Sequence, residues 1–497
     1  MTTNPVHIPP LSPLGHTSWP DRSATARIGD GAIFNPMLIA MAIIYVIWSW
    51  VHLPSSIWVR SLLACYLIWR MKPDVILPFV LTCAQLRIQI GEKGGFDDAQ
   101  SMAEQMTGFE QYAFILPCIL YFIRTFFAAM SARVTRRAQF PFWLYNLYLF
   151  GMLFVVFGAI SAYGTSGWTA GVRDYCVVGL YFYGLLMPGC SKEQLAQVLL
   201  GFAIVGLLTV VGNLLVGFQS RQLWVLLPVA GSFAPLLFVS GGRMLQYVVA
   251  TLFFVLGWMF AVKATFTLVL LWIWNAIAGI SIGMLGVPSA RRGITSALTY
   301  GLLAMTVFMF FFGALTHDPT KELLVTGQSA EVWSTYDKMI YKLRGDRGTI
   351  WWGAMLELAN NPTACGNPSP KFHVRAHNKD TIWTFSTHSI LMDPLLRLGV
   401  VSGPILLLIL VHAVMVAKNA VTRERDIGIA VLGLTVISNI VLGGATLPYM
   451  LNERAAEHMY MVAGLLGVYG MRKVVVQPHV PYAWPGNATY PRAFPAA

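Results

Sequence analysis

Apolar runs, several of them about 20 residues long, recur from residue 32 almost to the end of the chain. A helix of that length crosses a hydrocarbon layer roughly 30 Å thick. Lipid offers unpaired backbone groups no hydrogen-bond partner, so each run is predicted to be helical. With 56% hydrophobic and only 11% charged residues, the chain is too apolar to be a soluble globular protein.

The pattern predicts an all-α, polytopic membrane protein with about 12–14 transmembrane helices. The approximate edges of the apolar runs are 32–51, 55–70, 74–90, 109–131, 141–162, 175–189, 195–217, 222–240, 244–262, 264–286, 294–315, 390–417, 427–446 and 458–471. We expect a tail at 1–31, eleven helices in 32–315, a polar loop at 316–389, three helices in 390–471 and a second tail at 472–497. Both tails lack helical periodicity and are expected to be disordered and cytoplasmic.

Lysine and arginine gather in alternate short loops, and basic residues near the ends of spans favour the cytoplasmic face. The clusters that this rule places inside are Arg70 and Lys72, Arg133, Arg136 and Arg137, Lys192, Arg243, Arg291 and Arg292, Lys418, Arg423 and Arg425, and Arg472 and Lys473. The loop 316–389 then faces the outside. Topology accounts for most of the net charge of +12, and no basic stripe with interleaved aromatics points to nucleic acid.

The outer loop of about 70 residues is longer than a connector requires. Residues 331–343 and 347–359 place apolar side chains at helical spacing, which predicts two amphipathic helices. Asn361 and Pro362 end the second helix, and the stretch through Lys371 is expected to form turns. His373, Arg375 and His377 are assigned to a solvated polar turn.

Metal, disulfide and nucleotide chemistry find no support in the sequence. Its six cysteines lack CxxC spacing, and Asp97 with Asp98 is better explained as a solvated turn than as a cation site. No Gly-rich phosphate loop or HExxH element is present. We therefore expect no cofactor and no metal.

Four residues at the outer boundary form a candidate site: Arg221, Lys263, Arg347 and His388. A guanidinium binds phosphate oxygens through bidentate, charge-assisted hydrogen bonds and stabilises a departing diphosphate. A histidine near neutrality takes a proton from an attacking hydroxyl. The ordinary alternatives are a solvated or ion-paired Arg347, a structural His388, and snorkelling by Arg221 and Lys263 at helix ends.

Around these residues the chain resembles the bacterial O-antigen ligase and polymerase superfamily, integral membrane glycosyltransferases that act on undecaprenyl-diphosphate-linked glycans. The shared pattern, in this sequence, is Arg347, Trp351, Asn361-Pro362, Gly366, His388-Ser389, Leu391, Leu395, Gly399 and Gly403. Upstream, the segment SRQLWVLLPVAGSFAPLL resembles the family's outer turn that contains an arginine, here Arg221, and Lys263 stands where many members have Ser-Arg. Two departures are Ser389 in place of the commoner Asn, and three residues instead of two between the last glycines.

The resemblance implies a GT-C-like, all-helical membrane fold whose periplasmic loop covers a cavity open to lipid. It implies a metal-independent, inverting transfer with His388 as base and with Arg347 and Arg221 binding the diphosphate, an interaction to which Lys263 adds. The leading hypothesis is a polysaccharide polymerase of the bacterial inner membrane that joins undecaprenyl-diphosphate-linked repeat units, with a chain-length regulator or export proteins as candidate partners. The alternatives are a ligase that transfers the glycan to lipid A core or protein, and a flippase or transporter without chemistry.

Overall fold

A computed structural model describes residues 58, 61, 62, 65, 66, 108–134, 140–186, 195, 263–318, 342–361, 372–376, 379–383, 387, 389–424, 426–443 and 453–470. Both tails, the predicted spans 32–51, 74–90, 222–240 and 244–262, and most of 55–70 and 195–217 lie outside these residues. The predicted helix 331–343 is described only in its last two residues.

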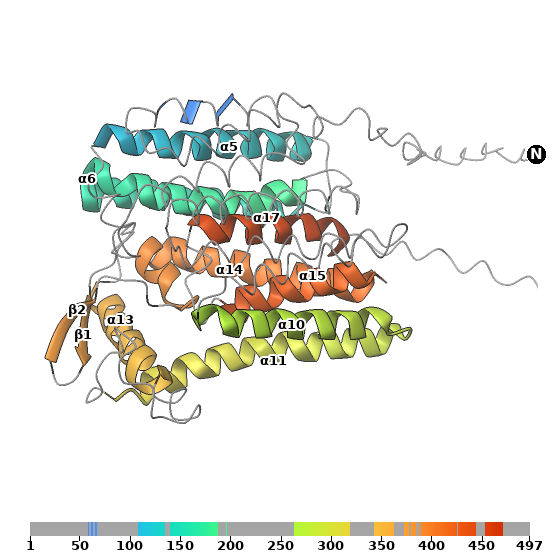
Figure 1. Ribbon diagram of the computed structural model, residues 1–497. Coiled ribbons are helices and arrows are strands. Elements are labelled where there is room, and N and C mark those ends of the chain that lie inside the picture. Colours follow the sequence, from blue (N-terminus) through green and yellow to red (C-terminus); the bar gives the residue numbers. More distant parts are fainter. Residues whose placement is uncertain are drawn as a thin grey trace, which may run out of the picture.

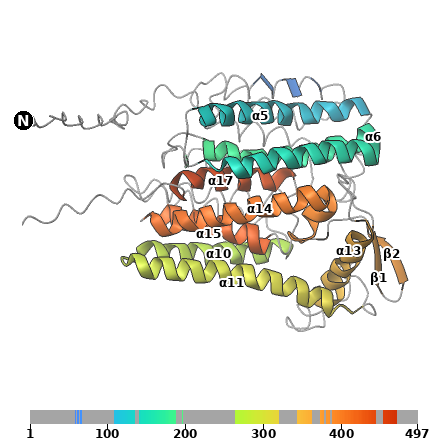
Figure 2. The ribbon, with the colours of Figure 1, turned by 180° about the vertical axis from the view of Figure 1, so that it is seen from behind.

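Long helices dominate the described residues and lie side by side along one direction (Figures 1 and 2). They are α5 (Gly108–Val134), α6 (Phe142–Leu186), α10 (Lys263–Met284), α11 (Pro288–Leu315), α14 (Asp393–Arg423), α15 (Ile427–Ser438), continued by the π-helix η5 (Asn439–Gly443), and α17 (Glu453–Gly470). Each lies on an apolar run that the sequence predicts to be helical, and the helical assignment is confirmed there. By length and composition, α11 and α14 are able to cross a membrane.

Helix α6 folds back on itself. The ring centroids of Tyr145 and Phe182 lie 5.2 Å apart, and Tyr148 stacks on Tyr175 at the same distance. In a straight helix with a rise of 1.5 Å per residue, Tyr145 and Phe182 would be separated by about 55 Å. The chain therefore reverses within α6, and its two legs coincide with the separate apolar runs 141–162 and 175–189.

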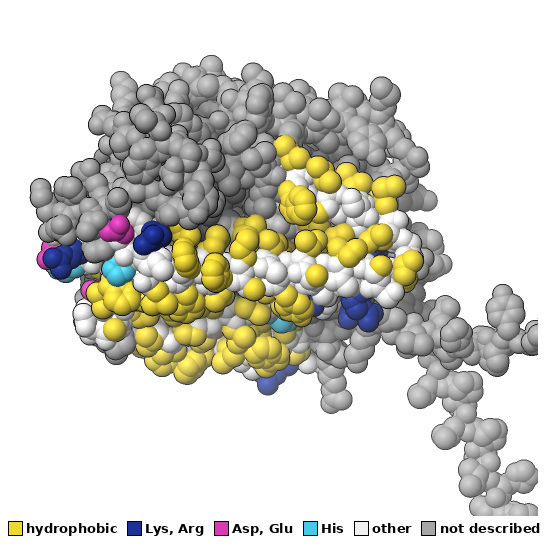
Figure 3. Space-filling model, turned by 90° about the horizontal axis from the view of Figure 1, so that it is seen from below, with side chains coloured by type: hydrophobic (Ala, Val, Ile, Leu, Met, Phe, Trp, Pro, Cys, Tyr) yellow, Lys and Arg dark blue, Asp and Glu magenta, His cyan; other side chains and the backbone are white. Residues whose placement is uncertain are grey.

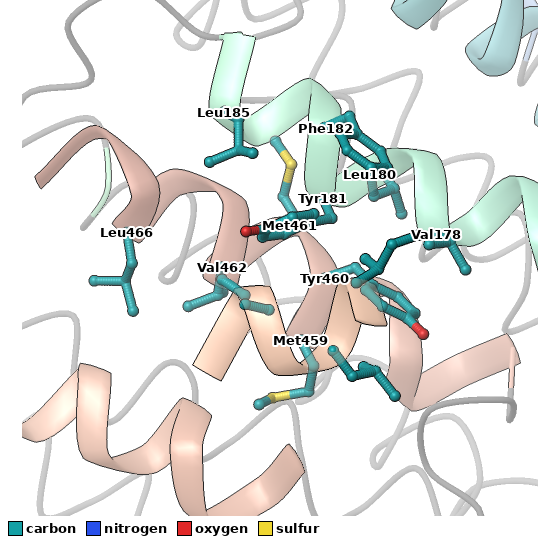
Figure 4. Close-up of a cluster of buried hydrophobic side chains, with 14 of the residues drawn as sticks. Val178, Leu180, Tyr181, Phe182, Leu185, Met459, Tyr460, Met461, Val462 and Leu466 are labelled. Carbon is teal, nitrogen blue, oxygen red and sulfur yellow. The ribbon is translucent and has the colours of Figure 1, made fainter. Parts of the chain in front are cut away.

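The main core lies between the second leg of α6 and the helices α14 and α17. Tyr181, Phe182, Tyr460 and Leu466 belong to its buried side chains (Figure 4). The rings of Tyr181 and Phe182 meet edge to face, which suits their charge distribution. Polar contacts are sparse and interhelical: Tyr181 Oη lies 2.5 Å from Nδ1 of His412 on α14.

Large hydrophobic side chains also cover the outside of the bundle. Among them, Phe127, Trp274 and Phe308 each expose more than half of their surface. Along α10 and α11 the hydrophobic side chains cover most of the face, and charged groups lie mainly near its two ends (Figure 3). Extended apolar surfaces of this kind mark faces that contact a membrane or another protein.

Arginine side chains bind the C-terminal ends of three helices at one end of the bundle, which we call the arginine end. Arg291 Nε donates to Ile282 O at 3.1 Å and Arg291 Nη2 donates to Gly283 O at 2.9 Å, both in the last turn of α10. Its Nη1 donates to Glu424 O, at the end of α14. Arg423 Nη1 donates to Gly470 O, at the end of α17, at 2.7 Å. Arg291 is thus more than a topology signal, because its buried side chain donates to carbonyls at the ends of two helices.

At the opposite end, the loop end, a small subdomain packs on the end of α11 (Figure 1). It consists of the π-helix η4 (Lys342–Arg347), α13 (Gly348–Asn360) and the strands β1 (Phe372–Ala376) and β2 (Lys379–Trp383). The strands are antiparallel, with Phe372 opposite Trp383 and Ala376 opposite Lys379. Helix α13 confirms the helix predicted at 347–359.

The described residues are mostly helical, as predicted, and the hairpin is an exception that corrects the assignment of His373 and Arg375 to a turn. Both side chains are exposed, as expected, but they lie on β1. The physical reason is alternation: Phe372 and Val374 point to the opposite face, where they are buried beside α13.

Candidate functional site

The loop-end subdomain begins where η4 passes into α13. Arg347, the last residue of η4, has helical backbone angles (φ −69°, ψ −43°), so the chain enters α13 without a break. The next residue must be glycine, because a Cβ on Gly348 would lie 2.2 Å from Gly313 O of α11. This close approach fixes the first turn of α13, and with it the backbone of Arg347, on the end of α11.

A second hydrophobic core lies beneath α13 and joins four elements. Its buried members are Phe310 and Ala314 from α11, Ile350, Trp351 and Ala354 from α13, Phe372 and Val374 from β1, and Met392 and Leu396 at the start of α14. Trp351 is 3% exposed, and its ring lies 5.2 Å from that of Phe310. The subdomain is therefore packed on the bundle through apolar contacts and is more than a polar connector.

A buried polar network continues from Trp351 to the start of α14. Trp351 Nε1 donates a hydrogen bond to Thr387 O at 2.9 Å. Thr387 in turn donates twice to Asp393 Oδ1, from its backbone N at 2.8 Å and from Oγ1 at 2.7 Å. Asp393 N donates to Ser389 O at 2.9 Å. Thr387, Ser389 and Asp393 are each at most 2% exposed, so these bonds are shielded from water.

The network closes a short ring in the chain. Asp393 holds Thr387 through its carboxylate and Ser389 through its backbone N–H, and His388 stands between these two residues in the sequence. Sequence reasoning missed Asp393 and Thr387. The available signal was an aspartate directly before Pro394 at the start of an apolar run, a pattern typical of the first turn of a helix.

The four predicted site residues are described to different extents. Arg347 lies on η4 at the loop end and is partly buried. Lys263 begins α10, whose Gly283 lies at the arginine end. The backbone of Lys263 is therefore about 30 Å from the arginine end and lies toward the loop end. Arg221 and the residue His388 itself lie outside the described residues, so their roles stay predictions.

The structure connects the surroundings of Arg347 and His388 through one hydrogen bond. Trp351 follows Arg347 by one helical turn, and Thr387 immediately precedes His388. The bond from Trp351 Nε1 to Thr387 O therefore ties the turn that carries Arg347 to the ring that contains His388. This tertiary contact joins positions 36 residues apart in the chain.

Two motif glycines have backbone roles. Gly399 has φ 79° and ψ 177°, a conformation that is essentially restricted to glycine, and it kinks α14 after its first turns. Beyond the kink, a Cβ on Gly403 would lie 2.8 Å from Pro394 O. These glycines let the segment that follows Asp393 fold against the rest of α14.

Neighbouring polar groups that the sequence analysis did not select also lie at the loop end. His317 stacks on Trp352, with centroids 5.0 Å apart and planes 14° from parallel, and its Nδ1 lies 2.8 Å from Ala314 O. A carbonyl oxygen can only accept a hydrogen bond, so Nδ1 of His317 is the donor in this pair. Arg344 Nε donates to Thr316 O at 3.0 Å, so this arginine ties η4 to the end of α11.

Within the described ranges, no three His, Cys, Asp or Glu side chains gather in a group that could hold a metal ion. Comparisons with protein-family models, with curated proteins and with solved structures give no match.

Proposed function

We propose that this chain is an integral membrane glycosyltransferase of the bacterial inner membrane that joins undecaprenyl-diphosphate-linked glycan repeat units, with its reaction at the loop end. One observation carries the proposal beyond the sequence resemblance. A buried network links the helical turn of Arg347 to the two residues that flank His388, at one end of an apolar helical bundle. A polar site supported by an apolar bundle suits a substrate with a lipid tail and a water-exposed sugar.

In the proposed reaction, a hydroxyl oxygen of the acceptor glycan bonds to the anomeric carbon of the donor sugar. The bond from that carbon to the phosphate oxygen breaks, and undecaprenyl diphosphate leaves with the bonding electrons. His388 takes the hydroxyl proton. Arg347, with Arg221 and Lys263, binds the diphosphate and stabilises the charge that develops on it. Energy comes from cleavage of the sugar–diphosphate bond, so the reaction needs no nucleotide.

The test gives purified protein in lipid nanodiscs an undecaprenyl-diphosphate repeat unit and follows lipid-linked glycan length by gel and mass spectrometry. Wild type is expected to extend the glycan. His388→Ala should lower the rate about 10²–10⁴-fold, the usual contribution of a general base. Arg347→Ala should lower it about 10²–10³-fold, and Arg347→Lys less, because an ammonium gives a single point charge without the bidentate fork.

The loop end supplies matched controls on β1. His373→Ala and Arg375→Ala remove the same side-chain types from exposed strand positions and should leave the rate unchanged. Normal extension by both His388→Ala and Arg347→Ala would contradict the assigned roles. Transfer only to added lipid A core would identify a ligase, and transbilayer movement of the donor without its consumption would identify a transporter.

A further inference from the structure

We propose that Asp393 is a positioning residue: by closing the ring from Thr387 to Asp393 it fixes the backbone on both sides of the predicted base His388. The inference deepens the proposed function and rests on it for its catalytic consequence. It assigns a role to a residue outside the sequence motif. The ring and its anchor are the observations that carry it.

The ring has three hydrogen bonds over seven residues. Two of them reach the same atom, Asp393 Oδ1, from the backbone N and the side-chain Oγ1 of Thr387. The third runs from Asp393 N to Ser389 O. A carboxylate that accepts from a backbone N–H and a hydroxyl together restrains both the direction of the chain and the side chain of the residue before His388.

Burial makes this restraint strong. Thr387 is fully buried, and Ser389 and Asp393 are each 2% exposed. Water cannot readily replace the bonds, so their loss leaves buried polar groups without partners. The carbonyl of Thr387 is separately held by Trp351 Nε1, which anchors the ring to α13. The ring therefore moves with the helix that follows Arg347, and together they set the separation of the base and the diphosphate-binding group.

The start of α14 supports the ring from the other side. Pro394 follows Asp393 at the first positions of the helix, where its missing N–H is not needed. Because of the kink at Gly399, Pro394 O and Leu395 pack against Gly403 of the same helix. Asp393 is thus fixed on a rigid support, as a group that positions a catalytic residue requires.

The experiment compares three variants of the full-length protein in nanodiscs: Asp393→Ala, Asp393→Asn and Thr387→Val. Asparagine keeps an oxygen that can accept both bonds from Thr387, whereas alanine keeps none. Valine keeps the backbone N–H of residue 387 and loses only the hydroxyl bond. Two readouts are used: hydrogen exchange of peptides that cover residues 384–396, and the kcat and KM of glycan extension.

Asp393→Ala is expected to speed exchange in these peptides and to lower kcat about 100-fold, the usual effect of misplacing a reacting group by about 1 Å. Its KM for the lipid-linked donor should change little, because donor binding depends on Arg347. Asp393→Asn should keep slow exchange and stay within roughly tenfold of wild-type kcat, and Thr387→Val should fall between the two. Asp426→Ala is the matched control: Asp426 also accepts from a backbone N–H, that of Ile429 at 3.0 Å, but at the far end of the bundle.

Unchanged exchange in Asp393→Ala would overturn the inference, and so would an asparagine variant as impaired as the alanine variant. Loss of donor affinity with unchanged kcat would overturn it as well, since that would make Asp393 part of donor binding. A wild-type protein that consumes no donor refutes the proposed function instead. That failure is distinguishable because the exchange comparison does not depend on turnover.

Discussion

The substitution Arg291→Leu tests the interaction that joins the helices at the arginine end. Arg291 is 2% exposed and donates to Ile282 O, Gly283 O and Glu424 O, which are carbonyls at the ends of α10 and α14. These carbonyls have no partner within their own helices and carry the negative end of the helix dipole. One planar guanidinium therefore connects the end of α10 with the end of α14, although Arg291 and Glu424 are 133 residues apart in the chain.

The expected magnitude follows from the three bonds. Hydrogen bonds to a charged group contribute about 1.5–3 kcal/mol each, so three contribute roughly 5–9 kcal/mol. The desolvation of a buried cation offsets several kcal/mol of that sum. We expect Arg291→Leu to lower the free energy of unfolding by about 3–5 kcal/mol. Arg291→Lys should lower it by roughly 2 kcal/mol, because a single ammonium cannot reach all three carbonyls.

The assay is an SDS titration of the full-length protein in bicelles, with unfolding followed by tryptophan fluorescence. Arg292→Leu is the matched control, since it removes the same charge from the adjacent, exposed position and should change the free energy by less than about 0.5 kcal/mol. A midpoint for Arg291→Leu equal to that of Arg292→Leu would refute the reasoning. It would mean that the three bonds are replaced by water at no cost.

Two further predictions concern the backbone and the sidedness of the chain. Gly399→Ala should destabilise the protein by about 1–3 kcal/mol in the same titration, because alanine does not favour φ 79°, whereas Gly301→Ala, with open space around its Cβ, should be neutral or slightly stabilising. Arg375→Cys, in a Cys365→Ser background, should react with a membrane-impermeant maleimide in cells with a permeabilised outer membrane, and Arg292→Cys should react only after lysis. The reverse labelling pattern would contradict the predicted topology.

The long helices were predictable from the length and composition of their apolar runs. Where apolar runs occur, as in α5, α11 and α14, only a helix satisfies the backbone. Helix α13 was predictable from periodicity, because Ile350, Met355 and Leu358 recur at helical spacing. The glycines 399 and 403 stood out only as a pattern, since the sequence does not state which glycine has a positive φ.

The hairpin was missed because its stabilisation is tertiary. The alternation of Phe372, His373, Val374 and Arg375 is short, and an isolated two-stranded hairpin is marginal in water. It becomes stable where α13 supplies an apolar surface for Phe372 and Val374. A two-residue period over five positions could not predict that surface.

Sequence alone was enough to predict the helical state of the apolar runs in the described helices and to place Arg347 and His388 in one polar loop between two apolar runs. These are properties of local composition and period, and they need no knowledge of what packs on what. Only the packing of the helices shows which of two adjacent arginines, Arg291 or Arg292, becomes buried, and that Asp393 bonds to Thr387 and Ser389. The reason is that these contacts depend on how the helices meet in space. Burial and hydrogen bonding of a polar side chain change its free energy by more than its neighbours in the sequence do.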